Sequence, residues 1–108
     1  MLQELTITSL QNPKIKALLE LQQKSAARRR EGLFVVEGQR ELMHCLEKGW
    51  RVESLFVDWD LPTASEGADV LDMGHVGLRG CRVYGVSAAV YERIAYRGST
   101  EGVVATVP

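Results

Sequence analysis

Several features that would point to particular classes of protein are scarce or missing in this sequence of 108 residues. Only two cysteines occur, Cys45 and Cys81, and neither belongs to a C-x-x-C pair or to a His/Cys cluster with metal-ligand spacing. We therefore expect two reduced, mostly buried thiols rather than a disulfide scaffold or a metal site. His44 directly precedes Cys45, but neighbouring residues on a helix point apart, which argues against a Cys/His nucleophile.

Long apolar runs are also missing, and no stretch approaches the roughly 20 residues that a membrane-spanning helix needs. The N-terminus lacks the basic-then-apolar layout of a signal peptide, which makes the cytoplasm the expected location. Neither G-x-G-x-x-G nor G-x-x-x-x-G-K-[ST] occurs, so the familiar phosphate-binding loops are excluded. We interpret the glycines of "GHVGLRG" (74–80) as part of a surface loop, and no pair of carboxylates stands out as a catalytic acid and base.

What the sequence does contain is the balance of a soluble globular domain, with 45% apolar and 25% charged residues. Its length suits one domain, which can bury about two-thirds of the surface that the unfolded chain exposes. Although the net charge is −1, positive charge is in local excess, because residues 10–30 carry six basic residues and one acidic residue. Such a patch indicates either a surface for an anionic partner or a solvated helix face, and charge alone favours the solvated face.

Helix and strand signals alternate along the chain. The first helix is expected over residues 12–30, with Asn12 as its N-cap and Pro13 in the first helical position. Its apolar stripe would consist of Ile15, Leu18, Leu19, Gln22 and Ala26. Because Arg29 projects onto that stripe, the helix should end by Arg28 unless Arg29 is turned towards a partner.

The remaining elements follow from short β-branched runs and from helix start and stop signals. Strands are predicted at 33–38, 52–58, 81–86 and 102–107, and helices at 39–48 and 88–96, the second of them capped by Ser87. Residues 59–80 are the least readable, with a loop followed by one or two helical turns that end near Gly74. This order predicts an α/β fold with helices on both faces of a short four-stranded sheet.

Two features leave a functional and a structural interpretation open. Trp50 and Trp59 flank the second predicted strand and could stack on bases, although covering the edge of the core is the commoner role. Glu37 ends the first predicted strand, close to Arg40 at the start of the next helix. It could hold an arginine of the 28–30 run in place, or it could simply favour the helix N-terminus. We weigh both interpretations of Glu37 equally.

The segment "ITSLQNPKIKALLELQQKSAARRREGLFVVEGQRELMHCLEKG" (7–49) resembles the N-terminal part of the SpoU/TrmH-type RNA ribose 2′-O-methyltransferases. The matching pieces are Ser9 followed by Asn12-Pro13, the basic stretch after the first helix, and "FVVEG" before a helix that contains Arg40. The stretch "STEGVVATV" (99–107) also resembles the strand that closes this domain, although the family often has Gln where this chain has Glu101.

The resemblance implies an RNA substrate-binding domain over residues 1–108, with an α/β/α sandwich fold similar to ribosomal protein L30e. It implies that a knotted methyltransferase domain, which binds S-adenosylmethionine and usually dimerises, follows Pro108. No catalytic residue or cofactor is then expected within residues 1–108, and this fragment alone should be non-catalytic. Structured RNA, either ribosomal or transfer RNA, is the expected partner.

The candidate site combines this resemblance with the basic patch. Phosphate contacts are expected from the basic side chains Lys14, Lys16, Lys24, Arg28, Arg29 and Arg30. Asn12 and Arg40 could contact sugar or base or could organise helix ends, and Glu37 would orient an arginine. Two alternatives stay open, a free-standing RNA-binding protein of the L30e/L7Ae kind and a non-catalytic protein-interaction module.

Overall fold

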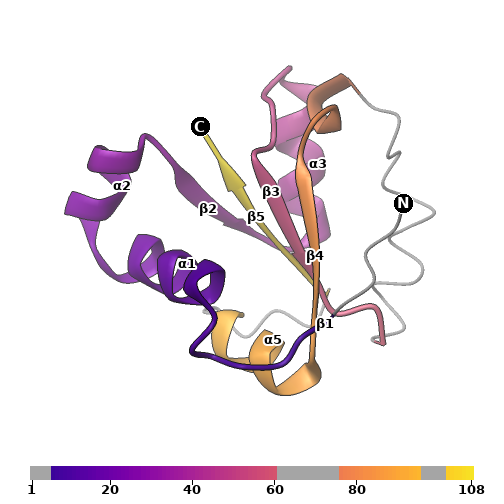
Figure 1. The fold of residues 1–108 in the computed structure, drawn as a ribbon. Coiled ribbons are helices and arrows are strands. Elements are labelled where there is room, and N and C mark those ends of the chain that lie inside the picture. The colour runs from indigo at the N-terminus through magenta and orange to yellow at the C-terminus, as the bar shows by residue number, and fades with distance from the viewer. Residues whose placement is uncertain (1–5, 61–75, 96–101) are drawn as a thin grey trace.

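Five strands form one mixed sheet at the centre of the structure (Figure 1). The computed structural model describes residues 6–60, 76–95 and 102–108. The strands are β1 (Thr6–Ile7), β2 (Phe34–Glu37), β3 (Ser54–Val57), β4 (Arg82–Val86) and β5 (Val103–Val107), in the order β1-β4-β3-β5-β2. β3 and β1 pair in parallel with β4, whereas β5 is antiparallel to both β3 and β2. Among the described residues, β2 is therefore the last strand on one side of the sheet.

Helices cover both faces of this sheet (Figure 1). Within the described residues they are α1 (Pro13–Gln23), α2 (Ser25–Glu31), α3 (Gln39–Glu47) and α5 (Ala88–Ile94), with a short 3₁₀ turn at Val76–Leu78. α1 and α5 pack on one face, and α3 packs on the other. The predicted α/β fold with helices on both faces of the sheet is confirmed.

The core consists of two layers because successive residues of a strand point to opposite faces. On one face, Leu42 and Leu46 of α3 pack against alternate residues of β5. On the other face, Val104 of β5 packs with Ile15 of α1 and Ile94 of α5. All residues of β3 and β5 are buried, as expected for strands in the middle of a sheet covered on both sides.

Two predicted helix starts are confirmed by their caps. The Asn12 side chain accepts a hydrogen bond from the Lys14 backbone N–H at 2.9 Å, and Pro13 occupies the first position of α1. The Ser87 hydroxyl accepts a hydrogen bond from the Val90 N–H at 3.3 Å at the start of α5. Each side chain satisfies a backbone donor that has no partner within its helix.

The prediction of a single helix over residues 12–30 is wrong. α1 ends at Gln23, and Lys24 adopts an extended conformation (φ −126°, ψ 117°) before α2 begins. The break turns Ala27 into the core, at 1% exposure, whereas the predicted stripe residue Ala26 is exposed. A continuous helix would have pointed Arg29 at the apolar stripe, and the break removes that conflict.

The prediction of four strands is also wrong, because β1 was missed. β1 has two residues, which pair with Gly85 and Val86 of β4. Two residues cannot display the alternation by which strands are recognised in a sequence. The four predicted strands correspond to β2, β3, β4 and β5 within two residues at each end. The helical turns expected before Gly74 lie outside the described residues.

Candidate functional site

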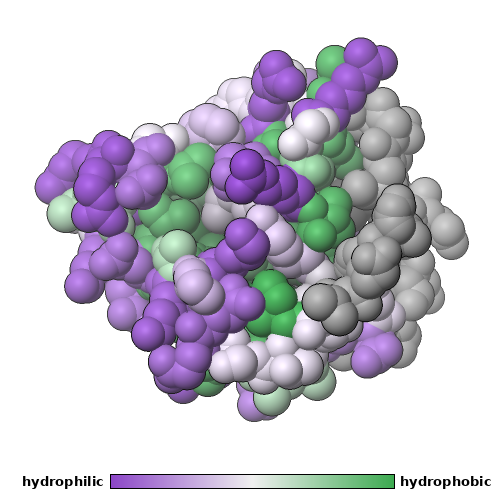
Figure 2. Space-filling view, in the orientation of Figure 1, coloured by the Kyte–Doolittle hydropathy of each residue, from purple (hydrophilic) through white to green (hydrophobic). Residues whose placement is uncertain are grey.

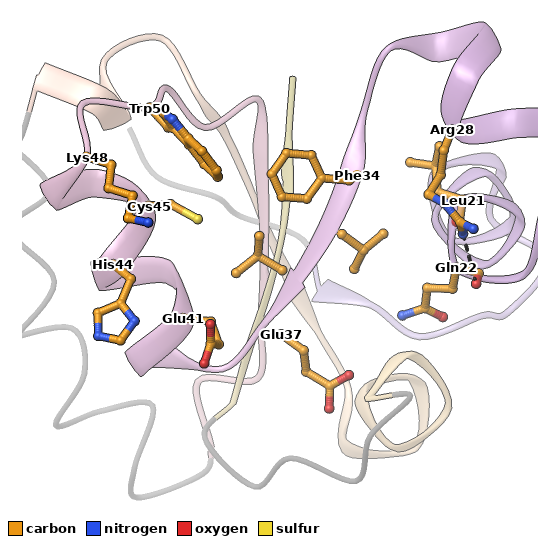
Figure 3. Close-up of a pocket in the computed structure, with 12 residues that line it drawn as sticks. Leu21, Gln22, Arg28, Phe34, Glu37, Glu41, His44, Cys45, Lys48 and Trp50 are labelled. Carbon is orange, nitrogen blue, oxygen red and sulfur yellow. Dashed lines mark hydrogen bonds between the residues drawn. The ribbon is translucent and has the colours of Figure 1, made fainter. Parts of the chain in front are cut away.

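A groove of about 550 Å³ follows the outer edge of β2 (Figure 3). All four residues of β2, Phe34–Glu37, line it. The α1–α2 side contributes Leu21, Gln22 and Arg28, and the α3 side contributes Glu41, His44, Cys45, Lys48 and Trp50. The groove exists because β2 is an edge strand and the helix layers extend past it on both sides (Figure 3).

The backbone N–H and C=O of Val35 in β2 face this groove. The Gly38 N–H donates to the Val103 carbonyl at 3.0 Å, in register with the pairing of Val36 and Ala105. Residues of an antiparallel pair direct their backbone groups alternately towards and away from the partner strand. Since Val36 and Gly38 face β5, the N–H and C=O of Val35 face the groove.

An aromatic pair lies at one end of the groove. The rings of Phe34 and Trp50 meet edge to face, with centroids 5.7 Å apart and planes at 87°. The backbone N–H of Trp50 donates to the Cys45 carbonyl at 3.0 Å, which fixes the Trp50 backbone just after α3. Trp50 nevertheless remains 44% exposed. It therefore covers the core edge beside Phe34 and also offers apolar surface to a ligand.

Arg28 has a structural role that the sequence did not reveal. Its Nη1 donates to the carbonyls of Leu21 and Gln22, at 2.6 and 3.3 Å (Figure 3). These carbonyls lie in the last turn of α1, where intrahelical donors are lacking. Arg28 thus joins the end of α1 to α2.

We expect Arg28→Ala to lower the free energy of unfolding by about 1.5–3 kcal/mol, because the lost hydrogen bonds come from a charged donor. Urea unfolding followed by circular dichroism measures this change. Arg29→Ala is the matched control, since Arg29 is exposed and its described contact is a 3.5 Å hydrogen bond to the Ser25 hydroxyl. It should change stability by no more than about 0.5 kcal/mol. Equal effects of the two substitutions would contradict a structural role for Arg28.

The other basic residues of α1 and α2 differ in how far their charge is neutralised. Glu20 pairs with Arg30 at 3.0 Å and with Lys24 at 3.9 Å. Arg30 also contacts Glu31 at 3.1 Å, and hydrogen bonds to Glu31 and Glu20 raise the pKa of Arg30. No ion pair is described for Lys16 or Arg29, and both are exposed.

We call Lys14, Lys16, Lys24, Arg29 and Arg30 the basic surface. Figure 2 shows hydrophilic side chains gathered over α1 and α2, on the left of the view. Lys14 lies on the sheet side of α1, where its ammonium group is 5.1 Å from the centre of the Tyr84 ring. This end of α1 adjoins a second hollow of about 280 Å³, lined on its sheet side by Arg82 and Tyr84 among others.

A family model described as the MRM3-like substrate binding domain matches residues 12–105. The chain belongs to this family. The match covers α1, α2, β2, the groove and the basic surface, and it confirms the resemblance drawn from the sequence. No match was found among curated proteins.

Solved structures similar to this MRM3-like domain are RNA methyltransferases. One is an RNA 2′-O ribose methyltransferase, 27% identical over 95% of this chain and 37% of that chain, with a TM-score of 0.75. Another is an rRNA methyltransferase from Sinorhizobium meliloti, 25% identical over 95% of this chain and 36% of that one, with a TM-score of 0.71. The SpoU methyltransferase AviRb from Streptomyces viridochromogenes, 23% identical, shares the fold over 89% of this chain and 32% of that one, at a TM-score of 0.65. The chain thus spans about a third of the length of these proteins.

In this MRM3-like domain the predicted site residues do not form one cluster. Asn12 caps α1, and Arg40 lies in the first turn of α3, which packs on the other face of the sheet. Glu37 and Arg28 both line the groove, but the hydrogen bonds described for Arg28 go to α1 carbonyls. The role of Glu37 in orienting an arginine therefore stays a prediction, as do the predicted RNA contacts.

Among the groove residues that sequence reasoning missed are Gln22, Phe34 and Lys48. They come from α1, β2 and the end of α3, and only the folded chain brings them to one place. The one available signal was Trp50, a large aromatic residue directly after the helix stop at Gly49.

The cysteines of the domain fit the prediction of free thiols. Cys45 is buried and Cys81 is partly buried, and both are unpaired. Burial raises the pKa of both thiols, and nearby Glu41 raises that of Cys45 further. The described residues contain no group of three potential metal ligands, and none of their helices is long and apolar enough to cross a membrane.

Proposed function

We propose that this chain is the RNA-binding domain of an S-adenosylmethionine-dependent RNA ribose 2′-O-methyltransferase. The observation that carries the proposal is the match of a substrate-binding domain model to residues 12–105. The similarity of the chain to an RNA 2′-O ribose methyltransferase and to an rRNA methyltransferase supports the same assignment. The family match favours this function over a free-standing L30e/L7Ae-like protein and over a protein-interaction module.

In this proposal the domain holds structured ribosomal or transfer RNA, and another part of the enzyme transfers the methyl group. S-adenosylmethionine would bind in a knotted methyltransferase domain after Pro108, through which the full-length protein would form a homodimer in the cytoplasm. A solved structure of a similar rRNA methyltransferase is AdoMet-bound, which supports the choice of cofactor. We also propose that the fold is an L30e-like α/β/α sandwich.

The basic surface would bind RNA phosphates. Phosphate contacts set affinity and register but carry little sequence information. Lys16 and Arg29 are the strongest candidates because they are exposed and have no described ion pair. Lys24 and Arg30 both pair with Glu20, and Arg30 also pairs with Glu31, so these two residues attract a phosphate less strongly than Lys16 and Arg29 do.

The test is binding of a labelled RNA hairpin at several salt concentrations. Changing both Lys16 and Arg29 to alanine should weaken binding and reduce the slope of log affinity against log salt by about 2, one for each lost phosphate contact. The matched control changes Arg51 and Arg79 to alanine, which removes the same charge from exposed positions outside α1 and α2. Equal slopes for the two double variants would show that the basic surface does not bind the RNA.

A further inference from the structure

We propose that the groove along β2 binds one unstacked nucleotide of the RNA, with its base against Trp50. The proposal rests on the proposed function and adds to it a site for the unpaired part of the substrate. Proteins read single-stranded RNA by stacking splayed bases on aromatic side chains and by hydrogen-bonding the base edges. The groove offers both kinds of contact.

Trp50 supplies the stacking surface. Its backbone is fixed to Cys45 and its ring contacts Phe34 edge to face, so the indole is positioned before a ligand arrives. It nevertheless keeps 44% of its surface exposed, so part of the ring is accessible to a ligand. A base that stacks on this ring would bury apolar surface with little loss of side-chain freedom.

Polar groups along the groove can contact the edge of the base. The backbone N–H and C=O of Val35 face the groove and offer one donor and one acceptor. The Gln22 side chain donates from Nε2 to the Ile94 carbonyl at 2.6 Å, which fixes the amide and leaves its oxygen as an acceptor. Glu41 also lines the groove, but towards the end away from Trp50 (Figure 3).

Charge favours a base over the phosphate backbone as the main occupant. Among the lining residues, two cations, Arg28 and Lys48, are balanced by two carboxylates, Glu37 and Glu41. Because the lining has no net charge, it provides no general attraction for a polyanion. Figure 3 shows Trp50 and Phe34 at the end nearer Lys48 and Arg28, with the carboxylates towards the other end. A nucleotide would thus place its base on Trp50 with its phosphate near a cation.

The volume of the groove agrees with this occupant. At about 550 Å³ it falls within the range of about 300–1,000 Å³ that is typical of small-molecule pockets. The walls are two helix layers, and a groove of this volume suits one unpaired nucleotide better than a base-paired duplex.

The test uses Trp50 as its own reporter. The chain has two tryptophans, so Trp59→Phe leaves Trp50 as the sole indole. This variant is titrated with an RNA hairpin that has an unpaired loop and with a blunt RNA duplex of the same charge. We expect the loop RNA to quench Trp50 fluorescence and the duplex to leave it unchanged. Equal quenching by both RNAs, or by neither while both bind, would overturn the inference.

A second measurement uses Trp50→Ala in the otherwise unchanged chain. Affinity for the loop RNA should fall at least about fivefold, as expected for loss of one stacked base, while duplex affinity stays the same. Trp50→Phe keeps a ring and should retain most of the affinity, and it serves if the alanine variant does not fold. If loop affinity is unchanged in Trp50→Ala, the inference is wrong.

The outcomes separate this inference from the proposed function. Weakened binding of both RNAs by the Lys16 and Arg29 double variant, with no effect of Trp50→Ala, leaves the proposed function intact and removes the base site. Failure of the chain to bind either RNA overturns both. Quenching of Trp50 by an extended peptide but not by loop RNA would assign the groove to a protein segment and overturn the inference.

Discussion

Replacing Gly38 with alanine is expected to lower the free energy of unfolding by about 3 kcal/mol. Gly38 precedes α3 with φ 99° and ψ 154°, a conformation that only glycine adopts readily. Relaxation is prevented from both sides, since the Gly38 N–H donates to Val103 at 3.0 Å and its carbonyl accepts from Leu42 at 3.1 Å. An alanine must therefore hold a strained backbone or give up one of these buried hydrogen bonds.

Gly32→Ala is the matched control for this prediction. Gly32 also has positive φ, but its φ of 67° and ψ of 31° lie in the left-handed helical region, and nothing lies within 4 Å of an added Cβ. That region costs an ordinary residue about 1–2 kcal/mol. Urea unfolding of the two variants compares the positions directly. If Gly32→Ala destabilises as much as Gly38→Ala, the backbone at Gly38 is less constrained than its two hydrogen bonds imply.

Gly38 also illustrates what could be predicted from the sequence. The run "FVVEG" followed by amphipathic residues placed the boundary between β2 and α3 to within a residue. The caps of α1 and α5 could likewise be predicted, because Asn12 and Ser87 act on backbone groups two or three residues away. Local interactions of this kind can be predicted from neighbouring residues in the sequence.

Features that depend on distant parts of the chain could not be predicted. β1 is a strand only because β4 pairs with it, and its two residues have no pattern of their own. The break at Lys24 turns Ala27 into the core, and the place where α2 meets the rest of the core depends on residues outside this segment. The helical projection of residues 12–30 assumed one continuous helix and therefore placed Ala26, not Ala27, inside.

The candidate site, too, was predicted only in part. The sequence identified a basic segment, but it treated the three consecutive arginines as equivalent. In the structure Arg28 closes the end of α1, Arg29 is exposed and Arg30 is held by two carboxylates. Their different surroundings arise because α2 is a separate short helix. The groove along β2 could not be predicted at all, since the strand's position at the sheet edge depends on β5 returning from the far end of the chain.

The largest loss of stability is expected from Leu42→Ala, about 2–5 kcal/mol. Leu42 is fully buried and lies with Leu46 in the core layer between α3 and the sheet. α3 has nine residues, too few for a stable helix in isolation, so its packing on the sheet must hold it in place. A loss of this size is a large share of the roughly 5–15 kcal/mol by which a domain is stable.

Leu19→Ala provides the control with identical chemistry, because Leu19 is only partly buried against the other core layer. It should cost about 1–2 kcal/mol, since less surface is uncovered and solvent can fill the space. Urea unfolding followed by circular dichroism and by Trp50 fluorescence in the Trp59→Phe background measures both variants. Because Trp50 is bonded to the end of α3, the two signals must coincide if α3 unfolds with the sheet. An early fluorescence transition in Leu42→Ala would show that α3, and with it one wall of the groove, detaches on its own.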